Sequence, residues 1–127
     1  MHITTSGDEE KRQKKICVKS GNNKREVLSE EIHYIESNGR KVILHLQQEN
    51  VEYYDKIGQL EQILKPDFFR IHKGYLVNMR YVSDYDRTEV FMKNQDNLLI
   101  SKYRYQDFVK AYQDYKEYHA KHVGQES

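Results

Sequence analysis

The chain has 127 residues, of which 37% are hydrophobic and 32% charged, so it is the size of one ordinary domain and has no room for a second. No apolar run approaches the roughly 20 residues needed to cross a bilayer, which excludes a transmembrane helix, and the single cysteine, Cys17, excludes an internal disulfide framework. The net charge of +1 falls short of the strongly basic balance typical of nucleic-acid-binding domains.

The charges are unevenly distributed along this nearly neutral chain. Residues 1–25 carry a net +4 and residues 26–64 a net −5, followed by +3 over residues 65–110 and −1 over residues 111–127. A chain divided in this way can present a local basic face while it stays neutral overall. Residues 1–15 contain no apolar region behind their charges, so no secretory signal is indicated and the cytoplasm is the expected compartment.

The N-terminal sequence predicts a polar lead followed by a β-hairpin. Residues 1–15 hold too few apolar side chains to repay the entropy of ordering, so we expect a flexible lead or linker remnant there. The domain is expected at residues 16–119, with a polar tail at 120–127. Ile16 and Val18 alternate with polar neighbours, and turn-forming residues at 20–23 separate them from a second short strand at 24–28.

A second hairpin is predicted around Asn38 and Gly39. The flanking segments, residues 32–36 and 41–46, are rich in β-branched and aromatic side chains. The Asn-Gly pair predicts a type I′ turn, because both central residues of that turn need a positive φ. A further strand is expected at residues 51–55.

Helical periodicity occurs in two places. Ile57, Leu60, Ile63 and Leu64 predict a short amphipathic helix that buries this face and ends before Pro66. Strand-like segments return at residues 68–72, 75–78, 81–85, 89–93 and 97–101. A C-terminal helix follows and is expected to end around residues 119–124. One face of this helix carries Tyr105, Phe108, Val109, Tyr112 and Tyr115. The connections are too short for successive βαβ crossovers, so we expect a mostly β domain of short antiparallel strands in small sheets.

The sequence contains no motif for catalysis or metal binding. Its six histidines lack Cys or carboxylate partners at metal-binding spacing, and it has no Gly-rich phosphate loop. No motif supplies Cys17 or Ser101 with the His and Asp that a catalytic nucleophile needs. We therefore expect a protein that is not an enzyme and needs no cofactor or metal.

Several basic residues fall at predicted loops, where long cationic side chains can project. Such side chains can enter a groove of DNA and reach both phosphates and base edges. Loops are polar in most proteins, so this pattern alone does not separate DNA binding from an ordinary solvated surface. The residues concerned are Arg40, Lys41, Lys73, Lys93, Lys102 and Arg104.

Three ordered segments are more specific: residues 32–41 (IHYIESNGRK), 69–78 (FRIHKGYLVN) and 98–101 (LLIS). They resemble the successive blocks of the LytTR family of bacterial DNA-binding domains, and the resemblance extends over about residues 16–112. It implies about ten short antiparallel strands without a recognition helix. It also implies a transcription regulator whose loops enter successive major grooves, commonly at direct repeats near promoters.

The resemblance implies roles for individual residues. Arg40, just past the Asn-Gly turn, occupies the place from which family members reach a base, and Lys41 the adjoining place that holds backbone phosphate. Lys73 matches the projecting residue that follows the family histidine, His72. Lys93 corresponds to a basic contact in the later hairpin.

The last loop departs from the family pattern. Ser101 matches the serine that opens this loop, but Tyr103 stands where a basic residue commonly reads a base. Lys102 and Arg104 lie on either side of it. Either Arg104 substitutes after a modest loop shift, or Tyr103 contacts a thymine methyl group or a phosphate.

Three more residues are candidates for the interface: Asn38, Arg70 and His72. Arg70 and His72 lie inside a strand segment, where they either contact DNA or hydrogen-bond to neighbouring turns and position Lys73. For Asn78, a turn-capping role is expected rather than binding.

We therefore predict sequence-specific binding to double-stranded DNA by a bacterial transcription regulator that pairs on promoter repeats. Family members usually follow a phosphoacceptor receiver domain in a two-component response regulator. A receiver is a domain of ordinary size, roughly 100–150 residues, so here it would be a separate regulatory partner or a linked domain. The alternative is a non-enzymatic protein-interaction module that uses its β edges and C-terminal helix.

Overall fold

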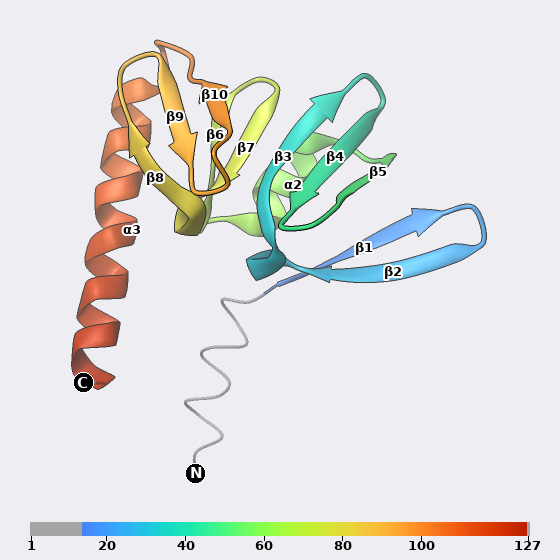
Figure 1. The fold of residues 1–127 in the computed structure, drawn as a ribbon, viewed down its shortest axis with the longest axis horizontal. Helices are drawn as coiled ribbons and strands as arrows, with labels where there is room; N and C mark the ends of the chain where they lie inside the picture. Colours follow the sequence, from blue (N-terminus) through green and yellow to red (C-terminus); the bar gives the residue numbers. More distant parts are fainter. Residues whose placement is uncertain (1–13, 127) are drawn as a thin grey trace.

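The computed structural model describes residues 14–126 as three antiparallel sheets with two α-helices and two short 3₁₀ segments (Figure 1). The first sheet is a hairpin of β1 (Lys15–Ser20) and β2 (Asn23–Leu28). The central sheet has the strand order β5-β4-β3-β7-β6, and the third sheet has the order β10-β9-β8. This architecture confirms the predicted mostly β fold with one middle helix and one C-terminal helix.

The bounds of the remaining elements follow the predicted segments closely. In the central sheet they are β3 (Ile32–Asn38), β4 (Lys41–Leu46), β5 (Asn50–Tyr54), β6 (Phe68–His72) and β7 (Tyr75–Asn78). In the third sheet they are β8 (Val82–Tyr85), β9 (Glu89–Met92) and β10 (Asn97–Leu99). The helical segments are η1 (Ser29–Glu31), α2 (Ile57–Leu64), η2 (Met79–Tyr81) and α3 (Tyr105–Glu126).

The central sheet separates two hydrophobic cores. Ile35 and Leu76 lie opposite each other on β3 and β7 and point into the core that α2 and the first sheet cover. Their neighbours Tyr34 and Val77 point to the other face, into the core shared with the third sheet and α3. Consecutive strand residues point to opposite faces, and burying each large aliphatic side chain contributes roughly 1.5–3 kcal/mol. Apolar residues at consecutive positions therefore place β3 and β7 in the middle of the domain.

Helix α2 ends at Leu64, before Pro66, as predicted, but its buried face is narrower than expected. Ile57, Leu60 and Leu64 are buried, whereas Ile63 is 47% exposed. Successive residues are rotated by about 100° around a helix, so Ile63 lies well to one side of the stripe that contains Leu60 and Leu64. The prediction that Ile63 shares the buried face is wrong for this reason.

Helix α3 packs its first turns against the third sheet. Phe108 is fully buried and meets the ring of Tyr85 edge-on at 5.3 Å between centroids, and the Tyr112 hydroxyl donates to the Val82 carbonyl at 3.2 Å. The helix continues to Glu126, through residues that the sequence assigns to the polar tail, and extends beyond the sheet (Figure 1). The predicted lead, apart from its last two residues, lies outside the described residues. Neither described helix has the length and apolarity to span a membrane.

The β3–β4 turn differs from the predicted type I′ turn. Asn38 pairs with Lys41 in the ladder, so the central residues of the turn are Gly39 and Arg40. Gly39 has a φ of 64°, and Arg40 has no positive φ. A positive φ at the first central residue alone is the pattern of a type II′ turn, in which glycine occupies that place. Arg40 therefore lies at the tip of the hairpin and Asn38 remains in the strand.

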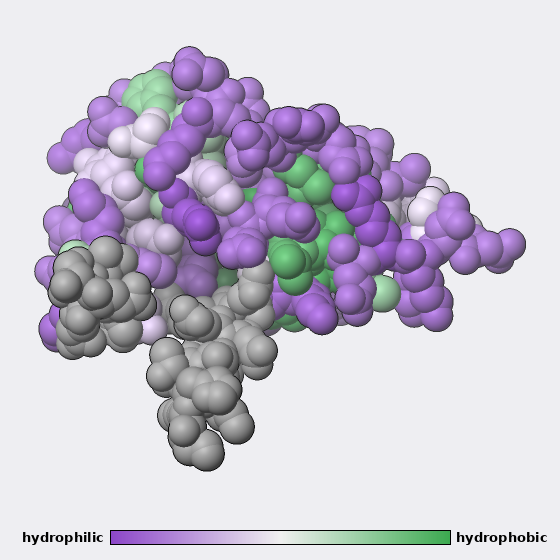
Figure 2. All heavy atoms as spheres, turned by 60° about the horizontal axis from the view of Figure 1, so that its bottom comes forward, coloured by the Kyte–Doolittle hydropathy of each residue, from purple (hydrophilic) through white to green (hydrophobic). Residues whose placement is uncertain are grey.

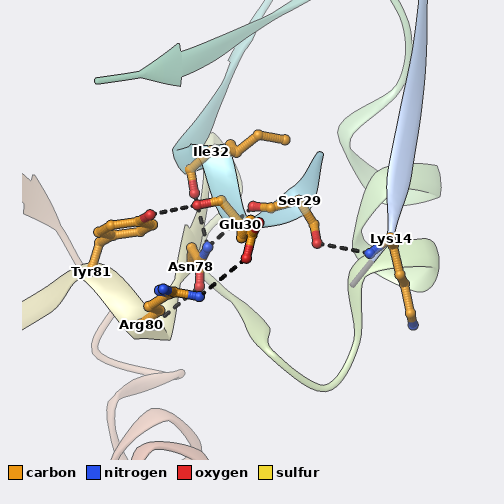
Figure 3. Close-up of polar contacts among 7 residues, drawn as sticks. All are labelled: Lys14, Ser29, Glu30, Ile32, Asn78, Arg80 and Tyr81. Carbon is orange, nitrogen blue, oxygen red and sulfur yellow. Dashed lines mark hydrogen bonds and ion pairs between the residues drawn. The ribbon is translucent and has the colours of Figure 1, made fainter. Parts of the chain in front are cut away.

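Asn78 links the central sheet to both 3₁₀ segments (Figure 3). Its side-chain amide donates to the carbonyls of Ser29 at 3.3 Å and Ile32 at 2.9 Å, and its side-chain oxygen accepts from the Arg80 backbone N–H at 3.1 Å. The residue is 3% exposed, so these groups have little access to water. The contact with Arg80 confirms the predicted turn-capping role.

Two further contacts in Figure 3 join η2 to η1. The Tyr81 hydroxyl donates to the Glu30 carbonyl, and the Arg80 guanidinium lies 3.6 Å from the Glu30 carboxylate. Because η2 leads directly into β8, these contacts help to hold the third sheet against the central one. The polar junction thereby supports the relative position of the loops at the far ends of both sheets.

Replacing Asn78 should destabilise the whole domain. Asn78→Ala should lower the free energy of unfolding by about 2–4 kcal/mol, because two buried carbonyls lose their donor and η2 loses its cap. Asn78→Asp keeps the acceptor for Arg80 but places a carboxylate against two carbonyl oxygens, so it should cost at least as much. Urea denaturation followed by circular dichroism measures both. A near-zero cost for Asn78→Asp would contradict the assigned amide contacts.

Candidate nucleic-acid interface

Four loops lie along one edge of the domain, the upper edge in Figure 1. They are the β3–β4 turn, the β6–β7 turn, the β8–β9 loop and the segment between β10 and α3. We call them together the loop edge, defined as residues 39–40, 73–74, 86–88 and 100–104. Antiparallel strands reverse direction at every turn, so every second turn of a sheet lies at the same end.

Backbone hydrogen bonds connect neighbouring loops of this edge. The Ser37 N–H donates to the Gly74 carbonyl at 2.9 Å, which ties the β3–β4 hairpin to the β6–β7 turn. The Ser101 N–H donates to the Ile71 carbonyl at 2.8 Å, and the Ile100 N–H donates to the Thr88 carbonyl at 3.0 Å. The loop edge is therefore one hydrogen-bonded surface assembled from segments that are far apart in the sequence.

Most of the predicted cationic residues come together here without acidic partners. Arg40, Lys73, Lys102 and Arg104 are exposed, and Lys41 adjoins Arg40 at the start of β4. None of these side chains forms an ion pair with another residue of the described part of the chain. Their positive charges therefore remain available to an anionic partner.

Two of these cations lie over exposed tyrosine rings. The Lys41 ammonium is 4.9 Å from the centroid of Tyr54, which is 71% exposed. The Lys102 ammonium is 5.2 Å from the centroid of Tyr103, which is 84% exposed. A ring attracts a cation without neutralising it, so these contacts orient each lysine and keep its charge.

Arg70 and His72 lie behind the β6–β7 turn and hold it. The Arg70 guanidinium donates to the Glu61 carboxylate at 3.1 Å and to the Lys73 carbonyl at 2.6 Å. The Gly74 N–H donates to Nδ1 of His72 at 3.1 Å. Both side chains therefore have the geometry of positioning residues, one of the two roles that the sequence left open.

Ser101 stabilises the turn in the segment between β10 and α3, residues 100–104, which is the last loop of the domain. The Tyr103 N–H donates to the Ser101 hydroxyl at 3.3 Å, and the Arg104 N–H donates to the Ser101 carbonyl at 2.9 Å. The Arg104 guanidinium donates to the Arg70 carbonyl at 3.2 Å. Arg104 thus lies against the end of β6, next to the β6–β7 turn, while the Tyr103 ring projects into solvent.

The structure does not bring Lys93 together with the other predicted residues. Its turn joins β9 to β10 at the lower end of the third sheet (Figure 1), and its N–H donates to the Tyr81 carbonyl of η2 at 2.7 Å. One strand, β10, separates this turn from Ser101, so the two must lie at opposite ends of that strand. Lys93 therefore lies away from the loop edge.

Arg87 is a cation of the loop edge that the sequence reasoning missed. It lies in the β8–β9 loop, with its guanidinium 5.3 Å from the centroid of the Tyr105 ring. The same strand alternation that moves Lys93 to the lower end could have placed Arg87 beside Ser101.

Acidic groups also lie on or near this edge. Asp86 accepts hydrogen bonds from the N–H groups of Thr88 and Glu89, both at or below 2.9 Å, and these bonds lower the pKa of Asp86 below its ordinary value. The Asn38 amide donates to the Glu52 carboxylate at 2.8 Å. The loop edge is therefore a set of cations between fixed negative charges rather than a uniformly basic surface.

Comparison with known proteins assigns the chain to a family. The family model described as the LytTr DNA-binding domain matches residues 22–113. The chain belongs to the LytTR family. This is a family of DNA-binding domains rather than a class of enzymes.

A solved structure shares the LytTR fold. The LytTr DNA-binding domain of a protein described as a methyl-accepting/DNA response regulator from Bacillus cereus superposes with a TM-score of 0.65 at 19% sequence identity. The match covers 76% of this chain and 94% of that chain. No curated protein matches this sequence at a significant level.

The lower end of this LytTR domain has a different electrostatic organisation. A cleft there is lined by residues of η1, the β4–β5 turn and η2. Figure 2, in which the lower side of Figure 1 is turned forward, shows a mainly hydrophilic surface with a smaller apolar area. Two of its arginines are paired with acids, Arg25 with Glu49 at 2.6 Å and Arg80 with Glu30 at 3.6 Å. Its cations are thus partly neutralised, in contrast to those of the loop edge.

His33 lies in the wall of this cleft and is 6% exposed. Its ring stacks on Tyr81 with 4.1 Å between centroids, and its Nδ1 has no hydrogen-bond partner among the described residues. Burial lowers the pKa of His33 below its ordinary value of 6.5, against an opposing influence of Asp96. The fold therefore favours the neutral imidazole.

This shift predicts a loss of stability in acid. The unfolded chain takes up a proton at His33 below about pH 6.5 while the folded domain resists it, so stability should fall as the pH drops below that value, by at most about 1.4 kcal/mol per pH unit from this residue. Urea denaturation of the wild type and of His33→Phe between pH 8 and pH 5 tests this. Equal slopes for the two proteins would contradict the assignment.

Proposed function

We propose that the loop edge binds double-stranded DNA in a sequence-specific way, with its loops inserted into the major groove. The domain would act in the cytoplasm as a bacterial transcription regulator at promoter direct repeats, where two copies pair. One observation supports this most directly: Arg40, Lys73 and Arg104, from three separate segments, lie on one hydrogen-bonded edge without acidic partners. Cations gathered along one edge can contact one duplex together.

The distribution of charge favours this edge over the rest of the surface. Association with DNA is driven largely by release of counterions when cations meet phosphates. Cations held in ion pairs, such as Arg25 and Arg80 at the lower end, must first give up their acidic partners. Lys41 and Lys102 are held over tyrosine rings instead and keep their full charge. A nearly neutral domain can therefore bind DNA through one edge.

The proposed roles follow from how each side chain is held. Arg40, at the tip of the β3–β4 turn, carries the planar set of donors that matches guanine O6 and N7. Lys41, at the base of the same turn, would hold a phosphate. Lys73 projects from a turn that Arg70 and His72 fix from behind, and it would contact the base or phosphate that the register presents.

The last loop would combine two contacts. Arg104 commits one of its five N–H donors to the Arg70 carbonyl and can direct others toward DNA. Tyr103, fully projecting, would contact a thymine methyl group or a phosphate, with Lys102 beside it. Lys93 is left out of the proposed interface because its turn lies at the opposite end of the third sheet.

The proposed regulator would be controlled by a linked receiver domain or by a separate regulatory protein. The end of the domain around η1 lies away from the loop edge (Figure 1). A partner bound at that end would stay clear of the DNA. The similar Bacillus cereus domain comes from a protein described as a response regulator.

The first test is a selection of binding sites from random duplexes, followed by a footprint at physiological salt. Arg40→Ala and Lys73→Ala should each weaken binding to the selected duplex, whereas Lys93→Ala, which removes the same charge at the opposite end, should leave it nearly unchanged. Circular dichroism confirms that each variant is folded. Equal losses for all three variants, or none, would contradict the loop edge as the interface and favour a protein-interaction module.

Substitutions of Arg40 and Lys41 should affect DNA binding in different ways. Loss of a base contact at Arg40→Ala should cost about 1–3 kcal/mol and relax the preference at one base pair. Lys41→Ala should weaken all sequences similarly and reduce the slope of log affinity against log salt by about one. Titrations at several salt concentrations with the selected and a scrambled duplex separate these outcomes. An equal loss of affinity for both duplexes in Arg40→Ala would show that Arg40 contacts a phosphate and not a base.

A further inference from the structure

Arg70 connects three segments behind the loop edge, two through its side chain and one through its backbone carbonyl. One terminal nitrogen donates to the Glu61 carboxylate of α2 at 3.1 Å, and the other donates to the Lys73 carbonyl in the β6–β7 turn at 2.6 Å. The backbone carbonyl of Arg70 accepts from the Arg104 guanidinium at 3.2 Å. Arg70 therefore touches both the β6–β7 turn and the last loop.

Glu61 is the anchor of this arrangement. Its side chain is 23% exposed and that of Arg70 is 18% exposed, so the pair is partly shielded from water. A shielded, charge-assisted hydrogen bond is stronger and more directional than a surface ion pair. Nε of Arg70 is buried and has no partner among the described residues, so its two terminal nitrogens set the orientation of the guanidinium.

The β6–β7 turn needs such support. The pairing of β6 with β7 is irregular between Arg70 and His72, so the regular ladder is interrupted just before the turn. The turn itself consists of Lys73 and Gly74 and is flanked by the strand pair His72 and Tyr75. Three further contacts hold it: the Gly74 N–H to His72, the Gly74 carbonyl to Ser37, and the Lys73 carbonyl to Arg70. The Lys73 carbonyl and the Gly74 N–H belong to one peptide group, so Arg70 and His72 hold this peptide from its two sides.

We propose that Glu61 is a positioning residue for DNA recognition: through Arg70 it holds the Lys73 carbonyl and so presets the β6–β7 turn. The proposal rests on the function proposed above. Glu61 touches no base or phosphate in this scheme, because a carboxylate next to the DNA backbone would repel it. A turn fixed before binding loses less conformational entropy on association than a mobile one.

Because Glu61 is negatively charged, simple electrostatics and the positioning role predict opposite changes in DNA affinity for Glu61→Gln. Glu61→Gln removes a negative charge near the loop edge, so simple electrostatics predicts tighter binding to every duplex. The positioning role predicts the opposite for the preferred duplex, since a neutral amide holds Arg70 less firmly. We expect affinity for the selected duplex to fall by about 3- to 10-fold, while affinity for a scrambled duplex stays equal or rises.

Glu49→Gln is the matched control. Glu49 pairs with Arg25 at 2.6 Å at the lower end of the central sheet, so this variant makes the same chemical change and also breaks an Arg–Glu pair. Glu49→Gln should leave unchanged the ratio of the affinity for the selected duplex to the affinity for the scrambled duplex. Tighter binding of Glu61→Gln to both duplexes, or an equal loss in ratio for both variants, would overturn the proposal.

A double substitution tests whether Glu61 acts through the turn. In a Lys73→Ala background, Glu61→Gln should change the affinity for the selected duplex by less than twofold, because the contact that it positions is already absent. Independent, multiplying losses would contradict the proposed route. Arg70→Lys, which keeps the charge but cannot bond both Glu61 and the Lys73 carbonyl, should reproduce the loss seen in Glu61→Gln and serves in its place if that variant does not fold.

A second measurement does not use DNA at all. Amide hydrogen exchange and ¹⁵N relaxation of the free domain should show faster exchange and more motion at Gly74 in Glu61→Gln than in the wild type, with no such change in Glu49→Gln. Unchanged behaviour at Gly74 would overturn the positioning role. If the wild type selects no sequence while Gly74 responds as expected, the proposed function fails and the structural link stands, so the two failures are distinguishable.

Discussion

The site depends on the alternation of antiparallel strands around a central sheet that is buried on both faces. Ile35 and Tyr34 point to opposite cores, as do Leu76 and Val77, so a slip of β3 or β7 by one residue would move each side chain into the wrong core and disrupt the packing on both faces. With the register held, the turns that follow β3 and β6 must lie at one end of the sheet. The third sheet then adds the β8–β9 loop and the segment before α3 to the same edge (Figure 1).

Electrostatics divides the two ends of the domain. At the lower end arginines are paired with glutamates, and the junction around Asn78 satisfies buried carbonyls and holds the third sheet in place. At the loop edge, the cations face aromatic rings, backbone carbonyls or solvent. The lower end therefore serves the stability of the fold, whereas the cations of the proposed interface form no ion pairs among the described residues.

The proposed interface is built in two layers. Arg40, Lys73 and Tyr103 project, whereas Arg70, His72 and Ser101 use their polar atoms on the backbone of the loops. The second layer explains how short loops without a recognition helix can present side chains at defined positions. Its anchor, Glu61, lies on a helix that packs in the core, so the packing of α2 and the geometry of the loop edge are coupled.

The amino-acid sequence by itself determined the positions of the strands and helices and the family, because apolar periodicity, turn residues and the FRIHKGYLVN block are local signals. It also predicted Asn78 as a cap, since that contact spans two residues. Only the tertiary structure decided that Lys93 lies away from the other cations, that Arg87 joins them and that Glu61 anchors Arg70. Alternation of the predicted strands puts Arg87 and Lys93 at opposite ends of β9. Which of these ends joins the other loops depends on how the sheets pack, and the Glu61–Arg70 contact joins separate elements, so no local pattern encodes either. The type II′ turn at Gly39 and Arg40 belongs to the same class, because the pairing of Asn38 with Lys41, rather than the Asn-Gly dipeptide, sets where the turn begins.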